Sequence, residues 1–278
     1  MRLAISNIAW DITEDEAIAE LLNRYGVDAI DIAPGKYFPQ PANANLEEMD
    51  AVNAWWSKRG IEITGMQALL FGTTGLNVFG SVESQDALLE HLAGVCRIGA
   101  GLDAPRLVFG SPKNRDRSGL SVAETESVAF TFFNRLGDIA ASHGVMICLE
   151  PNPICYGANF MATSAETAKV VNHIAHPAIR MQFDTGALAI NNEDPVLVLQ
   201  DFAHLIGHVH ASEPNLLPLG DGGTDHGKMF TALVQHLPHH LVSIEMVATK
   251  DEPHLVSIER ALVVAIEHYR KSEFVANS

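Results

Sequence analysis

Four short apolar runs in the second half of the chain each end in a side chain that can bind a metal ion. The final residues of these runs are Glu150, Asp184, His210 and Glu245. Consecutive endings are separated by roughly the thirty residues that a strand, a helix and their connections require. If the runs are neighbouring parallel strands, their carboxyl ends place all four side chains around one point.

The chemical composition of this group indicates a divalent cation. Carboxylate oxygens with a single imidazole suit Mn²⁺ best, with Mg²⁺, Co²⁺ and Zn²⁺ as alternatives. Three carboxylates held together without a cation would repel one another and would be unfavourable to desolvate. The sequence therefore predicts a metal site whose ligands are Glu150, Asp184, His210 and Glu245.

Strand-like apolar runs alternate with helical patterns along the chain, and no pattern indicates an antiparallel hairpin. The expected strands are residues 3–9, 29–33, 61–70, 106–110, 145–150, 179–184, 206–211 and 242–246. The expected helices are residues 15–25, 46–59, 84–99, 123–143, 164–173, 195–204, 228–237 and 253–270. This alternation predicts a single-domain (β/α)₈ barrel over residues 1–270 and a tail over 271–278. A doubly wound open sheet is the alternative, but no glycine-rich dinucleotide motif follows the first strand.

Composition restricts the partners and the compartment. Lys and Arg total 18 against 34 Asp and Glu, giving a net charge of −16. Such a charge repels nucleic acid and anionic membrane surfaces, and no apolar run is long enough to span a bilayer. The three cysteines, which have no CxxC spacing, indicate a reduced, cytoplasmic protein without disulfides.

Four motifs around the expected ligands resemble those of the xylose isomerase-like TIM-barrel superfamily. They are Leu-Glu-Pro-Asn at 149–152, Gln-Phe-Asp-Thr-Gly at 182–186, Gly-His-Val-His-Ala-Ser-Glu at 207–213 and Ser-Ile-Glu-Met at 243–246. The most similar branch contains ketose 3-epimerases, hydroxypyruvate isomerase and inosose isomerase. The resemblance implies that Glu150 and Glu245 bind the metal and also form an acid/base pair, with Asp184 and His210 as further ligands. It also implies a homo-oligomer, a dimer or a tetramer.

The chemistry that these residues suit is proton transfer next to a carbonyl group. Such a reaction needs a base near the C–H bond, an acid near the receiving carbon and a cation that stabilises the enediolate charge. Two carboxylates on opposite faces of an enediolate permit epimerisation, and transfer between adjacent carbons permits aldose–ketose isomerisation. The expected substrate is a small sugar or keto-polyol.

The chain departs from the ketose 3-epimerase pattern at two positions. Those epimerases carry a substrate-binding His three residues after the Asp of strand six, where this chain has Ala187. They also carry an Arg shortly after the His of strand seven, where this chain reads Glu-Pro-Asn-Leu over residues 213–216. Both departures weaken an assignment to ketose 3-epimerase and leave the metal ligands intact.

Further polar residues near strand ends are candidates for contacts with substrate hydroxyls: His226, Gln67, Asn152, Asn7 and Glu213. His208 is expected to lie one layer deeper than His210 as a hydrogen-bonded interior residue, not a ligand. Lys113, Arg115 and Arg117 form a basic cluster on the active face. We interpret this cluster as a solvated loop, with a phosphate or carboxylate site as the alternative.

Three other functions compete with a sugar isomerase or epimerase. A keto-inositol dehydratase would use the same ligands and differ in its product. An abasic-site endonuclease of this fold needs extra histidines at positions where this chain has Gln67, Gly110 and Ala187. A non-catalytic sugar-binding barrel would have no need of a second carboxylate across the substrate.

Overall fold

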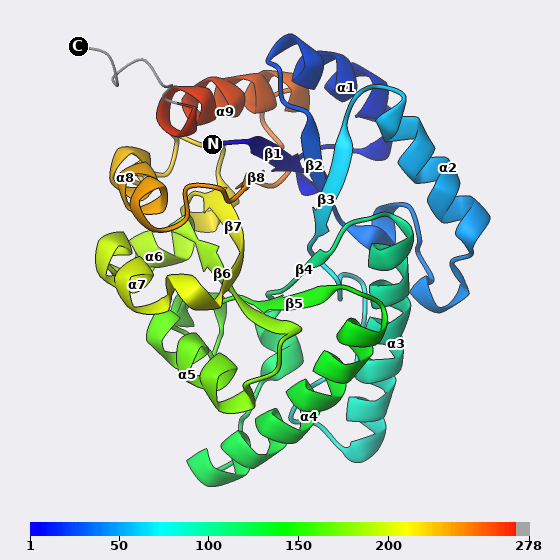
Figure 1. Cartoon of the computed structure of the whole chain (residues 1–278), viewed down its shortest axis with the longest axis vertical. Coiled ribbons are helices and arrows are strands. Elements are labelled where there is room, and N and C mark those ends of the chain that lie inside the picture. The colour runs from blue at the N-terminus through cyan, green and yellow to red at the C-terminus, as the bar shows by residue number, and fades with distance from the viewer. Residues whose placement is uncertain (271–278) are drawn as a thin grey trace.

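A computed structural model of the chain describes residues 1–270. Eight parallel strands form a closed barrel in the order β1 to β8, and β8 pairs with β1 (Figure 1). This closure confirms the (β/α)₈ barrel and rules out the open sheet, which would leave two edges unpaired. The strands are β1 (Leu3–Ser6), β2 (Ala29–Ile32), β3 (Glu62–Met66), β4 (Arg106–Phe109), β5 (Met146–Leu149), β6 (Ile179–Asp184), β7 (Ile206–Ser212) and β8 (Val242–Glu245).

The α-helices form a ring around the barrel (Figure 1). In the described part of the chain they are α1 (Asp15–Arg24), α2 (Leu46–Ser57), α3 (Val82–Gly101), α4 (Val122–Ser142), α5 (Ser164–Ile174), α6 (Thr185–Asn191), α7 (Pro195–Phe202), α8 (His226–His236) and α9 (His254–Tyr269). Eight of them match the helices expected from the sequence to within two residues at each end. The tail expected over residues 271–278 lies outside the described residues.

Helix α6 is the element that the sequence patterns did not predict. It follows β6 without a connecting loop, and the Asp184 side chain caps it by accepting a hydrogen bond from the Ala187 backbone N–H. Its first four residues, 185–188, are all buried, so this helix has no polar stripe at helical spacing. A pattern search that depends on amphipathic periodicity cannot detect such a helix.

Two expected strands end earlier than their apolar runs suggest. Strand β1 ends at Ser6, whose side chain accepts a hydrogen bond from the Ile8 N–H and caps a short 3₁₀ turn. Strand β3 ends at Met66, and Ala68 adopts a positive φ of 52°. The apolar residues beyond Met66 therefore belong to a loop on the carboxyl-terminal face of the barrel.

Packing on both faces of the barrel explains why its strands read as nearly continuous apolar runs. Every residue of β1, β2 and β8 is buried, and side chains such as Phe132 and Phe133 of α4 pack in the layer between the sheet and the helices. All three cysteines are free. Within residues 1–270, no helix is both long and apolar enough to cross a membrane.

Candidate metal centre

The fold brings the four expected ligands together. Asp184 and Glu245 are the last residues of β6 and β8, His210 lies near the end of β7, and Glu150 directly follows β5. One potential ligand atom from each residue lies within 4.8 Å of the others. The four residues are at most 9% exposed, because the parallel strands deliver them to the same interior end of the barrel.

The electrostatics of this cluster fit a divalent cation. Burial, reinforced by the negative charge of Glu245, raises the pKa of Glu150 to about 8 and that of Asp184 to about 6. Burial alone would lower the pKa of His210, but the nearby carboxylates raise it well above its usual value. One imidazolium cannot balance the negative charge of three carboxylates, and a divalent cation would neutralise the remainder. The cluster has the donor composition and burial of a divalent-metal site.

Hydrogen bonds fix two of the carboxylates. Asp184 accepts from the Ala187 N–H at 2.6 Å through Oδ1 and from the Ser212 hydroxyl at 2.6 Å through Oδ2. Glu150 accepts from Asn152 Nδ2 at 3.1 Å. Gly110 leaves room for Glu150, because a Cβ at residue 110 would lie 1.9 Å from Glu150 Oε2. The sequence reasoning did not identify the supporting roles of Ser212 and Gly110.

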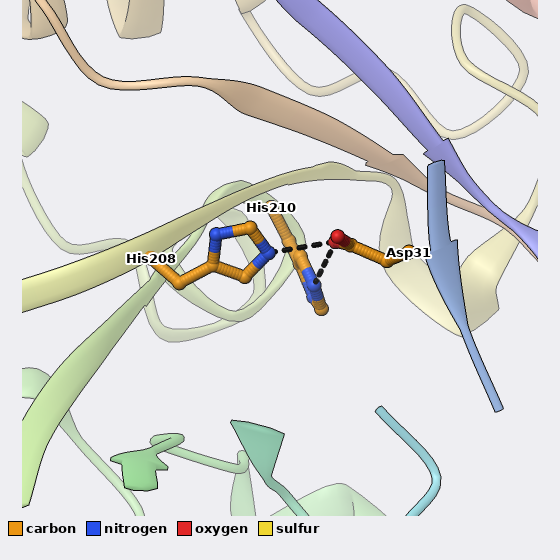
Figure 2. Close-up of side chains that lie close together, drawn as sticks. All are labelled: Asp31, His208 and His210. Carbon is orange, nitrogen blue, oxygen red and sulfur yellow. Dashed lines mark hydrogen bonds and ion pairs between the residues drawn. The ribbon is translucent and has the colours of Figure 1, made fainter. Parts of the chain in front are cut away.

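A second, deeper group lies next to the cluster and shares His210. His208 Nε2 lies 2.7 Å from Asp31 Oδ2, and His210 Nε2 lies 3.8 Å from the same oxygen. Figure 2 shows both rings of β7 turned toward the Asp31 carboxylate of β2. The other ring nitrogen of His210, Nδ1, faces the cluster and lies 3.3 Å from Glu245 Oε2.

Asp31 is therefore placed to orient His210. Burial would raise its pKa, but the charges of His208 and His210 and the hydrogen bond to His208 lower it well below the usual value. Thr64 Oγ1 donates to the other carboxylate oxygen at 3.1 Å. His208 is buried and hydrogen-bonded, as expected from its position one layer below His210. The sequence signal that could have identified Asp31 is a lone carboxylate between Ile30 and Ile32 of an apolar strand.

A cavity of about 820 Å³ opens next to the four-residue cluster. Glu150, Asp184 and Glu245 line it, as do Gln67 and Asn152, two of the expected substrate contacts. The side-chain oxygens of Gln67 and Asn152 are buried and have no hydrogen-bond partner among the described residues. Ala187, where ketose 3-epimerases carry a His, also lines this cavity, as do Asn215 and Leu216 of the segment where they carry an Arg.

The other three expected contacts do not line the cavity. Asn7 is buried, and its Oδ1 accepts from the Ala33 N–H at 2.7 Å. His226 has both ring nitrogens occupied, by the Tyr269 hydroxyl at 2.7 Å and Glu213 Oε1 at 3.1 Å.

Glu213 also accepts the Gly220 and Thr224 N–H groups, and these bonds together lower its pKa to about 2 despite burial. The Glu213–His226 pair therefore holds the loop between β7 and α8. The strand-end position of these residues was visible in the sequence, but their hydrogen-bond partners were not.

The interpretation of the basic cluster as a solvated loop is wrong for Arg115. Lys113 and Arg117 are partly or fully exposed, whereas Arg115 is fully buried. Its three guanidinium nitrogens have no hydrogen-bond partner within residues 1–270. Burial lowers its pKa to about 10, and the charge of Glu150 acts in the opposite direction. Arg115 thus contributes a buried positive charge near the cluster.

The closed barrel places a buried, metal-site-like cluster at the carboxyl ends of β5 to β8. This combination defines the class of barrel to which the protein belongs. The chain belongs to the family described as the xylose isomerase-like TIM barrel, whose model matches residues 19–271. This membership confirms the resemblance inferred from the four motifs. Among curated proteins, an inosose dehydratase from Clostridium botulinum is 30% identical over 80 residues, which cover 29% of this chain and 26% of that protein.

Solved structures share the whole fold at low sequence identity. D-psicose 3-epimerase from Clostridium cellulolyticum H10, solved with D-tagatose, superposes with a TM-score of 0.79 at 16% identity, covering 97% of this chain and 98% of that one. The 3-keto-D-glucoside 4-epimerase YcjR from E. coli gives 0.77 at 17% identity, covering 96% and 99%. The IOLI protein, solved with a bound zinc atom, gives 0.75 at 17%, covering 98% and 99%.

Proposed function

We propose that this protein is a divalent-metal-dependent sugar isomerase or epimerase that acts through an enediolate. The observation that supports this most strongly is the buried cluster of Glu150, Asp184, His210 and Glu245 beside a large cavity. A bound divalent cation would polarise the substrate carbonyl and stabilise negative charge on its oxygen. We propose Mn²⁺ as this ion, held by the same four side chains.

Glu150 and Glu245 are the proposed acid/base pair. Glu150 directly follows β5 and Glu245 ends β8, with β6 and β7 between them, and both line the cavity. Carboxylates that enter from separated strands can reach the two faces of a planar enediolate, so one removes a proton and the other returns one. In the metal-free site the pKa of Glu150 is raised to about 8, so its carboxyl can hold a proton near neutral pH.

Gln67 and Asn152 are the proposed contacts with substrate hydroxyls. Both residues line the cavity, their buried amide oxygens have no hydrogen-bond partner within residues 1–270, and Asn152 also donates to Glu150. Asn152 therefore couples substrate position to the orientation of one catalytic carboxylate. We further propose that the protein is a cytoplasmic homo-oligomer.

A keto-inositol dehydratase is the second candidate, supported by the local similarity to inosose dehydratase. It would use the same cluster and differ in eliminating water after proton removal. An abasic-site endonuclease is disfavoured because Gln67, Gly110 and Ala187 stand where it needs histidines, and a side chain at residue 110 would displace the Glu150 carboxylate.

The test of the proposed function is solvent deuterium incorporation with Mn²⁺ into ketoses, keto-inositols, hydroxypyruvate and sugar phosphates. Glu150→Gln and Glu245→Gln should each reduce exchange by about 10²–10⁴-fold, because each removes one proton-transfer group. Glu20→Gln, an exposed residue of α1, is the matched control and should exchange normally. Full exchange in either cavity variant would refute the acid/base assignment.

A further inference from the structure

The cavity has two sides of different chemistry. The charged cluster lies on the side of strands β5 to β8, whereas the loops that follow β1 to β4 form the opposite wall. That wall is mostly apolar and includes these residues: Ile8, Ala33, Ala68, Leu69, Leu70, Phe71, Val108 and Pro112. The segment 68–71 is the end of the apolar run beyond β3, so this run builds a cavity wall and not a strand.

Most of the polar side chains on the apolar wall are already bonded to the chain itself. The Lys36 ammonium donates to the Asn7 carbonyl at 2.6 Å and also to the Trp10 carbonyl. Ser111 donates to Asn114 Oδ1 at 2.6 Å, and Lys113 donates to the Thr73 carbonyl at 3.3 Å. A sugar ring against this wall would find few groups to satisfy its hydroxyls, and unsatisfied hydroxyls oppose binding.

Phe71 projects apolar surface from this wall into solvent. Its side chain is 87% exposed, although it lines the cavity and apolar area in water is unfavourable. Across the opening, the Tyr156 hydroxyl accepts a hydrogen bond from the Asn215 N–H at 2.6 Å, which holds a second aromatic ring at the cavity lining. Two aromatic rings at one opening favour a ligand with an apolar face.

The size of the cavity also exceeds what a free sugar requires. Cavities of about 300–1,000 Å³ hold drug-sized ligands, and a volume of about 820 Å³ lies high in that range. A free hexose has only about a dozen non-hydrogen atoms, so one placed over Glu150 and Glu245 leaves the apolar wall unfilled.

We propose that the substrate is a glycoside with a ketone on a ring carbon and an apolar aglycone at its anomeric carbon. The ketone provides the carbonyl that the enediolate requires, and Leu69, Leu70 and Phe71 bind the aglycone while the keto-sugar lies over the cluster. This inference rests on the proposed function for the position of the sugar. Ala187, which stands where ketose 3-epimerases carry a His, extends the apolar lining and agrees with a substrate other than a free ketose.

The test compares binding of methyl and phenyl glycosides to the Mn²⁺-loaded protein by isothermal titration calorimetry. Paired β-glucosides, β-galactosides and β-xylosides serve as probes. In at least one sugar series the phenyl glycoside should bind about tenfold or more tightly than its methyl partner, because the ring buries apolar surface against the wall. Phe71→Ala should reduce this preference several-fold and leave methyl-glycoside binding unchanged.

Phe130→Ala is the matched control, because Phe130 is also an exposed phenylalanine but lies on α4. It should retain the full preference. The proposal is overturned if no phenyl glycoside outbinds its methyl partner. It is also overturned if Phe71→Ala keeps the preference but converts a dimer to a monomer by light scattering, since Phe71 would then face a second copy. Binding requires no proton transfer, so this result is independent of the deuterium-exchange test.

Discussion

Two adjacent groups of carboxylates and imidazoles share His210 and differ in their electrostatics. In the outer group, burial and mutual repulsion raise the pKa of Glu150 to about 8 and that of Asp184 to about 6. In the inner group, Asp31 is equally buried, yet its pKa is well below the usual value. The inner group has two imidazoles for one carboxylate, whereas the outer has one imidazole for three.

The ratio of imidazoles to carboxylates therefore explains the difference, since Asp31 is at least as deeply buried as the carboxylates of the outer group. The inner group is electrostatically satisfied by its own side chains and by the Thr64 hydroxyl. The outer group is not, and it is the one that borders the cavity. This contrast supports the proposal that a cation binds the outer group while the inner group positions His210.

The largest effect that tests this contrast is stabilisation by metal. Adding Mn²⁺ to chelator-treated protein should raise Tm by roughly 10 °C, because a ligand at about 1,000 times its Kd stabilises the folded state by about 4 kcal/mol. Differential scanning calorimetry measures the shift. The double variant Glu150→Gln/Glu245→Gln should lose most of it. An equal rise in Tm in the double variant would show that Mn²⁺ binds at another site.

The next effect concerns the link between the two groups. Asp31→Asn should weaken Mn²⁺ binding about 10–100-fold, because the carboxylate that orients His210 would be replaced by a neutral amide. Titration monitored by Mn²⁺ electron paramagnetic resonance measures this affinity. His208→Asn keeps the Asp31 carboxylate facing His210 and should weaken binding less. If both variants bind Mn²⁺ as tightly as the parent, Asp31 has no positioning role.

A smaller effect is the pH dependence of metal-free stability. Well below pH 4, the carboxyls of Glu150 and Asp184, whose pKa values are raised by folding, are protonated in both the folded and the unfolded state. They therefore do not change the free energy of unfolding there. As pH rises toward 8, the unfolded state releases these protons first, so the free energy of unfolding should fall by about a few kcal/mol and level off above pH 8.

Urea unfolding at pH 5, 6, 7 and 8 measures this decline. Saturating Mn²⁺ should reduce it, because the cation stabilises the ionised carboxylates in the folded state, and Glu150→Gln should remove the larger part. A stability that rises with pH over this interval would contradict the raised pKa values.

The sequence was sufficient to predict the barrel and the four clustered side chains, because strand periodicity and strand endings are local properties. Asp31 was missed because it lies inside an otherwise apolar strand, and only barrel closure brings β2 opposite β7. The burial of Arg115 and the engagement of His226 by Glu213 and Tyr269 depend on how loops fold over one another. No local pattern encodes those contacts.

Asp184 has two duties in this fold, as a member of the outer group and as the cap of α6. Its orientation is therefore set by the backbone before any ion arrives. A substitution at Asp184 would disturb helix and ion site together, so loss of activity in such a variant could not be assigned to either. Glu150 and Glu245, which cap no helix, are the better positions for separating chemistry from folding.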